Sequence, residues 1–275
     1  MNLNETLKRI CVGCVGIPLI LFSSYTGRIL FLSIVNLIVL LGLLEFFSLM
    51  EKGGYSPFKV IGIFSVLSIC CEFYFFHGHR IVELIFVLLI FILIRSFFTK
   101  EGERIISVSV TLLGILYTSM FSSFILIREL PVKGDLTYTT MGKIVMFIFI
   151  TIWVLDTSAY FFGSAIGRHP LFLRVSPRKT WEGSIYGSIL AVTSAIVMHF
   201  VFIPQIKLFN ILMICIIIII AGHFGDFVES LFKREISVKD SSRILPGHGG
   251  ILDRFDSSIF AAPAVYIYII LIPFS

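Results

Sequence analysis

Charged residues are scarce in this chain. Asp, Glu, Lys and Arg make up 14% of its 275 residues, whereas hydrophobic residues make up 57%. Because a soluble domain typically carries about 25% charged residues, the composition excludes an ordinary soluble protein. The alternating pattern of outer-membrane barrels is also missing, since the apolar runs are continuous. Most of the chain is therefore expected to lie in lipid or against other membrane-spanning helices.

Other absences narrow the class further. The chain has no heptads, no low-complexity tail and no P-loop motif. Its five cysteines lie in apolar segments, and the pair Cys11 and Cys14 has no second ligand pair at zinc spacing, so these residues are interpreted as small apolar side chains. No small-residue cleavage site follows the apolar run after Lys8 and Arg9, so this run is expected to be retained as a first span.

Nine apolar segments are present, joined by short pieces that carry the Gly, Pro and charged residues. They cover approximately residues 10–25, 29–50, 59–76, 81–98, 106–126, 144–163, 183–204, 208–232 and 257–274. The pattern predicts an all-α, polytopic integral membrane protein with about nine transmembrane helices. Residues 1–143 are expected to hold about five N-terminal spans, and residues 144–275 to form a catalytic region of about four spans with the motif loops.

The distribution of Lys and Arg predicts how the chain is oriented. With nine spans, the N-terminus and the even-numbered loops share one side, which holds sixteen of the 22 Lys and Arg residues. Cytoplasmic loops are enriched in these residues, so the N-terminus is expected in the cytoplasm of a multi-pass cell-membrane protein. Both motif-bearing loops, 164–182 and 233–256, are then cytoplasmic, where nucleoside triphosphates are found.

The stretch from Gly225 to Ser257 interrupts the apolar pattern with four Asp and two Glu. Helical spacing places Asp226 and Glu229 on one face, and Asp253 and Asp256 repeat this spacing where a new span begins. Such oxygen ligands suit Mg²⁺, whereas zinc would need a His and Cys set. For each carboxylate alone, a salt bridge to a nearby Lys or Arg remains the alternative.

A glycine-rich turn, Pro246-Gly-His-Gly-Gly250, separates the two carboxylate pairs. Its glycines allow backbone N–H groups to approach an anion closely, and His248 could act in acid–base chemistry, bind phosphate or stabilise the turn. The cations able to neutralise phosphate oxygens are Lys233, Arg234, Lys239, Arg243 and Arg254. This set suits transfer of a nucleotidyl or phosphoryl group, which requires mainly positioning and charge neutralisation.

A second candidate group lies before the seventh apolar segment. Asp156 is a carboxylate within an apolar segment, which is a functional-site hypothesis by default, with a capping or structural Asp as the alternative. Pro177 can begin a helix with Ser176 as its N-cap. Arg178 and Lys179 would then lie at a helix start that favours anions. The alternative is a basic interfacial loop that only sets topology.

Residues 225–257 strongly resemble the signature of the phosphatidate cytidylyltransferases, the CDP-diacylglycerol synthases. The matching positions are Ser230, Lys233-Arg234, Lys239-Asp240, Pro246 to Gly250, and Asp253, Arg254 and Asp256. The segments Asp156 to Tyr160 and Ser176 to Gly183 resemble two further sequence elements of this family. Arg178 stands where a Lys is usual, and these two cations are not interchangeable at a tight phosphate contact. The resemblance covers about 110 residues of the C-terminal half.

The resemblance implies an Mg²⁺-dependent CTP:phosphatidate cytidylyltransferase of phospholipid biosynthesis, which forms CDP-diacylglycerol and pyrophosphate. The implied metal ligands are Asp226, Asp253 and Asp256, with a second metal or a monovalent cation left open. The implied catalytic residues are Asp226, Asp253, Lys239 and Asp156, and the implied phosphate-binding residues are Ser176, Arg178, Lys179, Lys233, Arg234, His248, Gly249 and Arg254. The expected partners are CTP, phosphatidate in the membrane and a second copy of the chain in a homodimer.

Nucleic acid is not an expected partner, because the net charge of +5 largely reflects the unequal distribution of Lys and Arg between the two sides of the membrane. Two alternative functions remain. A transporter or channel would also keep charged residues at membrane depth, although it would not need a Gly-His-Gly-Gly turn between carboxylate pairs. A related enzyme could act on another lipid acceptor, such as an isoprenoid or an archaeal ether lipid, because acceptor choice would lie in the apolar spans.

Overall fold

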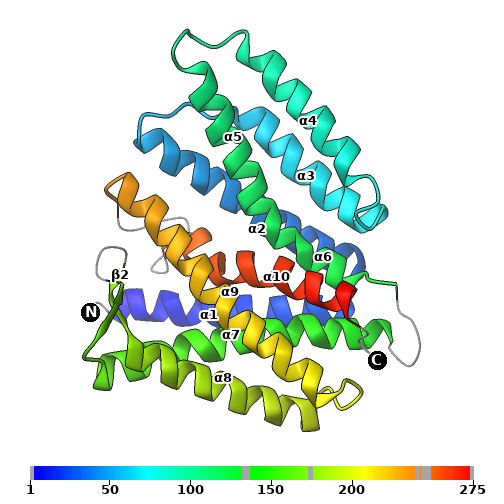
Figure 1. Cartoon of the computed structure of the whole chain (residues 1–275), viewed down its shortest axis with the longest axis vertical. Coiled ribbons are helices and arrows are strands. Elements are labelled where there is room, and N and C mark those ends of the chain that lie inside the picture. Colours follow the sequence, from blue (N-terminus) through cyan, green and yellow to red (C-terminus); the bar gives the residue numbers. More distant parts are fainter. Residues whose placement is uncertain (1–2, 132–136, 173–175, 239–241, 243–248, 273–275) are drawn as a thin grey trace.

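A computed structural model describes residues 3–131, 137–172, 176–238, 242 and 249–272 of the chain. In this part of the chain the elements are α1 (Leu3–Thr26), α2 (Arg28–Lys52), α3 (Lys59–Phe75), α4 (Ile81–Ser96), α5 (Arg104–Ser119), η1 (Met120–Ser122), α6 (Ser123–Arg128), α7 (Tyr138–Ile166), β1 (Pro170–Phe172), β2 (Ser176–Thr180), α8 (Trp181–Val201), α9 (Leu208–Glu235) and α10 (Leu252–Leu271). The helices form one bundle, with β2 and the N-terminus at one side and the C-terminus at the other (Figure 1).

The all-α multi-pass architecture is confirmed. Among the described residues, six helices are long and apolar enough to cross a membrane, and α5, η1 and α6 together count as one of them. They span Arg28–Lys52, Arg104–Arg128, Tyr138–Ile166, Trp181–Val201, Leu208–Glu235 and Leu252–Leu271. Each of the nine expected apolar segments coincides with a helix, but the number of spans, about nine, stays a prediction.

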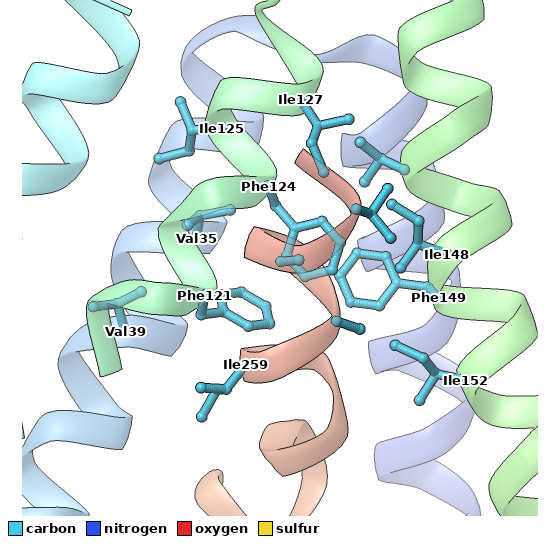
Figure 2. Close-up of a cluster of buried hydrophobic side chains, with 14 of the residues drawn as sticks. Val35, Val39, Phe121, Phe124, Ile125, Ile127, Ile148, Phe149, Ile152 and Ile259 are labelled. Atoms are coloured by element: carbon cyan, nitrogen blue, oxygen red, sulfur yellow. The ribbon is translucent and has the colours of Figure 1, made fainter. Parts of the chain in front are cut away.

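Aromatic and branched side chains fill the centre of the bundle. Figure 2 shows Phe121 of η1, Phe124 of α6 and Phe149 of α7 packed against residues of α2 and α10. The rings of Phe124 and Phe149 stack with centroids 4.5 Å apart, and Phe121 meets Phe255 of α10 edge to face at 5.2 Å. Aromatic pairs in these geometries add stabilisation beyond their buried area, so the first helices and the last helix share one core.

The start of α8 differs from the sequence expectation. A helix was expected to begin at Pro177 with Ser176 as its cap, but Ser176–Thr180 forms the strand β2, which pairs antiparallel with β1. The helix begins at Trp181, and the Thr180 hydroxyl caps it by accepting the N–H of Gly183 at 3.2 Å. Pairing with β1 supplies backbone hydrogen bonds that a local cap at Ser176 cannot match, so the hairpin displaces the helix start by several residues.

The Glu182 side chain closes the base of this hairpin. Its Oε2 accepts the backbone N–H groups of Arg168 and His169 at 3.1 and 3.2 Å, and its Oε1 pairs with His169 Nδ1 at 2.6 Å. Charge-assisted hydrogen bonds of this kind are stronger than neutral ones. The hairpin that carries Lys179 is therefore anchored to the helix that follows it.

A fully buried arginine secures the side of the bundle away from the hairpin. Arg128 donates from Nε to the carbonyl oxygen of Ser24 at 2.7 Å and from Nη2 to that of Tyr25 at 2.8 Å, and its guanidinium lies 3.7 Å from the ring centroid of Tyr138. These contacts bind the end of α1 to α6 and α7. Arg128 is thus a packing residue.

Candidate active site

The candidate site lies where α9 crosses the beginning of α10, beside the β1–β2 hairpin. At the crossing, an added Cβ atom on Gly225 would overlap the carbonyl oxygen of Asp256 and lie 3.2 Å from Cα of Ser257. Small residues at helix interfaces permit such close backbone approach in membranes. Gly225 therefore brings the carboxylates at the end of α9 close to those at the start of α10.

Lys179 reaches from β2 to the α9 carboxylate. Its Nζ forms an ion pair with Oδ2 of Asp226, and the two side chains are 29% and 24% exposed. On the other oxygen, Oδ1 of Asp226 accepts a long hydrogen bond of 3.4 Å from the Ser230 hydroxyl. Lys179 Nζ also lies 5.2 Å from the ring centroid of Phe227, so the lysine is held by both a charge and an aromatic face.

Lys233 joins the two carboxylate groups predicted from the sequence. Its Nζ donates to Oε2 of Glu229 at 2.6 Å and to Oδ1 of Asp253 at 2.7 Å. The second oxygen of Asp253 accepts the N–H of Gly250 at 2.8 Å. Gly249 has a φ of 81°, a left-handed conformation that glycine adopts without strain, and an added Cβ there would lie 2.9 Å from Asp253 Oδ2.

Asp156 and Asp256 add negative charge around Lys179. Burial lowers the pKa of Lys179, and the nearby charges of Asp256 and Asp156 partly oppose that shift. Asp256 is buried, and its Oδ1 accepts the N–H of Ser257 at 2.6 Å. Asp156 is exposed on α7. The structure thus gathers Asp156, Asp226, Asp253 and Asp256 around Lys179 and Lys233.

The other predicted site residues lie in more varied surroundings. Ser176 is half-buried, whereas Arg178, Arg234 and Arg254 are exposed. Arg178 follows Ser176 by two positions on β2, and Arg234 is adjacent to Lys233 on α9. Lys239 and His248 lie outside the described residues. Among the predicted site residues that the structure describes, two lysines contact carboxylates and three arginines are exposed.

The described carboxylates form no ready-made metal cage. Groups of three or more His, Cys, Asp and Glu residues placed to hold a metal ion are absent from the described residues. Each predicted central ligand instead contacts a lysine, Asp226 with Lys179 and Asp253 with Lys233. Oε1 of Glu229 is buried without a hydrogen-bond partner, and carboxylates outnumber lysines in the group. An oxygen donor set with excess negative charge fits a hard cation such as Mg²⁺.

Three residues of the site area were missing from the predicted set. Glu229 belongs to the carboxylate pairs whose spacing suits Mg²⁺ but not to the implied site residues, and Gly225 enters the sequence analysis only as the start of the charged stretch. Glu45 of α2 lies in the first half of the chain, yet its carboxylate contacts the first turn of α10. The available signal for Glu45 was a carboxylate within an apolar segment, which is costly unless it has a partner.

Comparison with known proteins agrees with the motif resemblance. The chain matches the cytidylyltransferase family over residues 7–272. A protein of Bacillus subtilis (strain 168) named phosphatidate cytidylyltransferase is 32% identical over 271 residues, which cover 94% of this chain and 96% of that protein.

Staphylococcal relatives align over a shorter segment. The phosphatidate cytidylyltransferases of Staphylococcus haemolyticus (strain JCSC1435) and Staphylococcus aureus (strain COL) are 48% and 43% identical over 126 residues. These alignments cover 46% of this chain and 48% of each relative, so the chain spans about half the length of these two proteins. The family match covers nearly the whole chain, and the Bacillus subtilis relative, 32% identical, aligns over 94% of this chain. The predicted resemblance to phosphatidate cytidylyltransferases is therefore confirmed, and the chain belongs to the cytidylyltransferase family.

Proposed function

We propose that this membrane protein is a phosphatidate cytidylyltransferase, which converts CTP and phosphatidate to CDP-diacylglycerol and pyrophosphate. The observation that carries the proposal is the group of carboxylates and lysines at the crossing of α9 and α10, all of which except Lys179 lie within the signature stretch. The name and full-length alignment of the Bacillus subtilis relative support the choice of substrates.

The reaction needs charge control more than covalent participation by the protein. An oxygen of the phosphatidate phosphate attacks the α-phosphorus of CTP, and the bond from that phosphorus to the oxygen bridging to the β-phosphate breaks. Pyrophosphate leaves with the bonding electrons. Such transfers depend on in-line positioning of the two oxygens and on neutralising the phosphate charge.

Lys179 and Lys233 are the cations best placed to bind substrate phosphates. Both are partly buried, at 29% and 13% side-chain exposure, and partial burial strengthens electrostatic interactions relative to those in water. Arg178, Arg234 and Arg254 would extend this positive surface outward, and Ser176 would add a hydroxyl donor. Gly249 keeps the backbone free of a side chain next to Asp253.

Mg²⁺ is proposed as the cofactor, with Asp226, Asp253 and Asp256 as its ligands and Asp156 in support. When bound, the ion would neutralise phosphate oxygens and assist their alignment. The chain's own contribution is to hold the carboxylates close together through the Gly225 crossing. A second metal or a monovalent cation remains compatible with the number of carboxylates.

The decisive experiment supplies purified protein with phosphatidate, Mg²⁺ and CTP labelled at either the α- or the γ-phosphorus. The proposal expects the α-label in the lipid product and the γ-label in pyrophosphate. Entry of the γ-label into lipid would indicate phosphoryl transfer instead. Offering an isoprenoid phosphate in place of phosphatidate tests the alternative acceptor, and failure of folded protein to form any CDP-lipid from phosphatidate would refute the proposal.

Asp253→Asn tests the role of the central carboxylate. The variant keeps the size of the side chain but removes a charge that binds Lys233 and is proposed to bind Mg²⁺, so turnover should fall by at least about 10³-fold while the protein remains inserted. Glu103→Gln makes the same chemical change at an exposed position before α5 and should leave activity near that of the unmodified protein. Near-normal turnover of Asp253→Asn would contradict the assignment.

The proposed reaction also requires the site to face the cytoplasm, where CTP is found. We therefore propose a cytoplasmic N-terminus and cytoplasmic motif loops. The excess of Lys and Arg in the loops on this side supports that orientation. A homodimer is proposed on the family resemblance alone.

A further inference from the structure

Glu45 is a buried carboxylate in the middle of an apolar helix. It is 1% exposed and lies on α2 among fully buried neighbours such as Leu43, Phe46 and Phe47. A carboxylate in such surroundings is costly unless hydrogen bonds satisfy its oxygens. Its position in the first half of the chain places it outside all the segments that resemble the family signature.

Both oxygens of the Glu45 carboxylate accept backbone N–H groups at the start of α10. Oε1 accepts the N–H of Ile251 at 2.8 Å, and Oε2 accepts the N–H of Leu252 at 2.9 Å. Oε1 also accepts the hydroxyl of Ser242 at 2.5 Å. The first N–H groups of a helix lack partners within the helix, and a negative charge there is further favoured by the helix dipole.

The α10 helix cannot cap itself in the usual way. Its N-cap residue is Ile251, which makes no side-chain capping hydrogen bond, because an isoleucine side chain has no acceptor. The cap is supplied from α2, a helix more than 200 residues earlier in the chain. The two helices touch at this level, since an added Cβ on Gly42 would lie 3.3 Å from Cδ2 of Leu252.

The capped residues adjoin a carboxylate of the candidate site. Asp253 directly follows Leu252, and its Oδ1 accepts Lys233 Nζ at 2.7 Å. Its Oδ2 accepts the N–H of Gly250 at 2.8 Å. A shift of the first turn of α10 would therefore move Asp253 relative to Lys233 on α9.

We infer that Glu45 is a positioning residue, which holds the first turn of α10 and thereby places Asp253 opposite Lys233. The expected effect of Glu45 on catalysis rests on the proposed function. It assigns a role in the reaction to a residue of the N-terminal half of the chain. Displacement of a reacting group by about 1 Å can lower turnover by about 10²-fold, so a backbone anchor of this kind affects the rate.

The test compares Glu45→Gln with a matched control, Glu72→Gln. Glu72 of α3 is also buried, at 5% exposure, and its Oε1 accepts the N–H of Arg80 at the start of α4 at 2.9 Å. The turn between α3 and α4 lies at the end of the molecule away from β2 (Figure 1). The two variants therefore make the same chemical change at two buried helix caps, only one of which adjoins the site.

Two measurements distinguish positioning from a general loss of stability. In Glu45→Gln, kcat should fall roughly tenfold or more while the KM for CTP changes by less than about threefold. Glu72→Gln should keep its kcat, because the helix start that Glu72 caps is that of α4, not that of α10. Thermal melts of both variants measure how much stability each has lost. Glu45→Ala should lower kcat further than Glu45→Gln, because the amide oxygen of Gln retains one acceptor.

Hydrogen exchange provides a readout that does not depend on activity. The amides of Gly250, Ile251 and Leu252 should exchange roughly tenfold faster in Glu45→Gln than in the unmodified protein, and at an unchanged rate in Glu72→Gln. Faster exchange at these amides would support the placement of Asp253 by Glu45 whether or not the unmodified protein forms CDP-lipid. A failure of the unmodified protein to form CDP-lipid would count against the proposed function alone. Unchanged exchange at these amides, or equal loss of kcat in the two glutamate variants, would overturn the inference.

Discussion

Lys179 and Arg178 are neighbours in the chain, but β2 gives them different surroundings. Side chains alternate between the two faces of a strand, and Lys179 pairs with Asp226 whereas Arg178 is exposed. At the helix start expected from the sequence, both residues would have similar surroundings. At the residue scale, the strand makes Lys179 the cation that belongs to the carboxylate group.

This difference gives a prediction for the two cations. Lys179→Gln should lower kcat/KM by about 10²-fold or more, as removal of one electrostatic contact from an active site typically does. Arg178→Gln, the matched control on the same strand, should lower it by less than about tenfold. Steady-state kinetics with varied CTP measures both effects, and equal losses in the two variants would contradict the distinction.

At the element scale, the close crossing of α9 and α10 is what assembles the site. The carboxylates of Asp226 and Asp253 come from two different helices, 27 positions apart in the sequence, and Gly225 allows these helices to meet at backbone distance. The spacing of charges in the sequence predicted which carboxylates share a helical face. It could not predict the approach of the two helices, because that depends on the shape of both surfaces.

Gly225→Ala tests this crossing. The new methyl group would collide with the backbone of Asp256, and overpacking against rigid atoms costs about 1–3 kcal/mol. The Tm in detergent should fall by roughly 3–10 °C, with a loss of activity. Gly16→Ala is the matched control on α1, where an added Cβ meets no atom within 4 Å. A Tm for Gly225→Ala equal to that of the control would show that the crossing tolerates a side chain.

At the scale of the whole molecule, the helices bring the N-terminus and β2 to one side and the C-terminus to the other (Figure 1). This arrangement agrees with the alternation of loops assumed for the Lys and Arg distribution. The division at residues 143 and 144 and the homodimer stay predictions.

Reporter fusions test the orientation in cells. Green fluorescent protein fused to the N-terminus should fluoresce, because the proposed N-terminus is cytoplasmic. Alkaline phosphatase should be active when fused after the C-terminus and inactive when fused after Glu235 at the end of α9. Activity of the fusion at Glu235 would reverse the proposed orientation and place the site on the wrong side for CTP.

The sequence by itself determined the membrane class, the approximate helices, the family and most candidate residues. These follow from composition, apolar periodicity and a signature stretch, all of which are local patterns. Only the tertiary structure decided that Lys179 meets Asp226, 47 residues away, and that Glu45 caps a helix 206 residues away. The hairpin at Ser176–Thr180 was likewise decided by pairing with β1. Contacts between distant segments depend on how whole helices pack, and the spacing of residues along the chain does not record that packing.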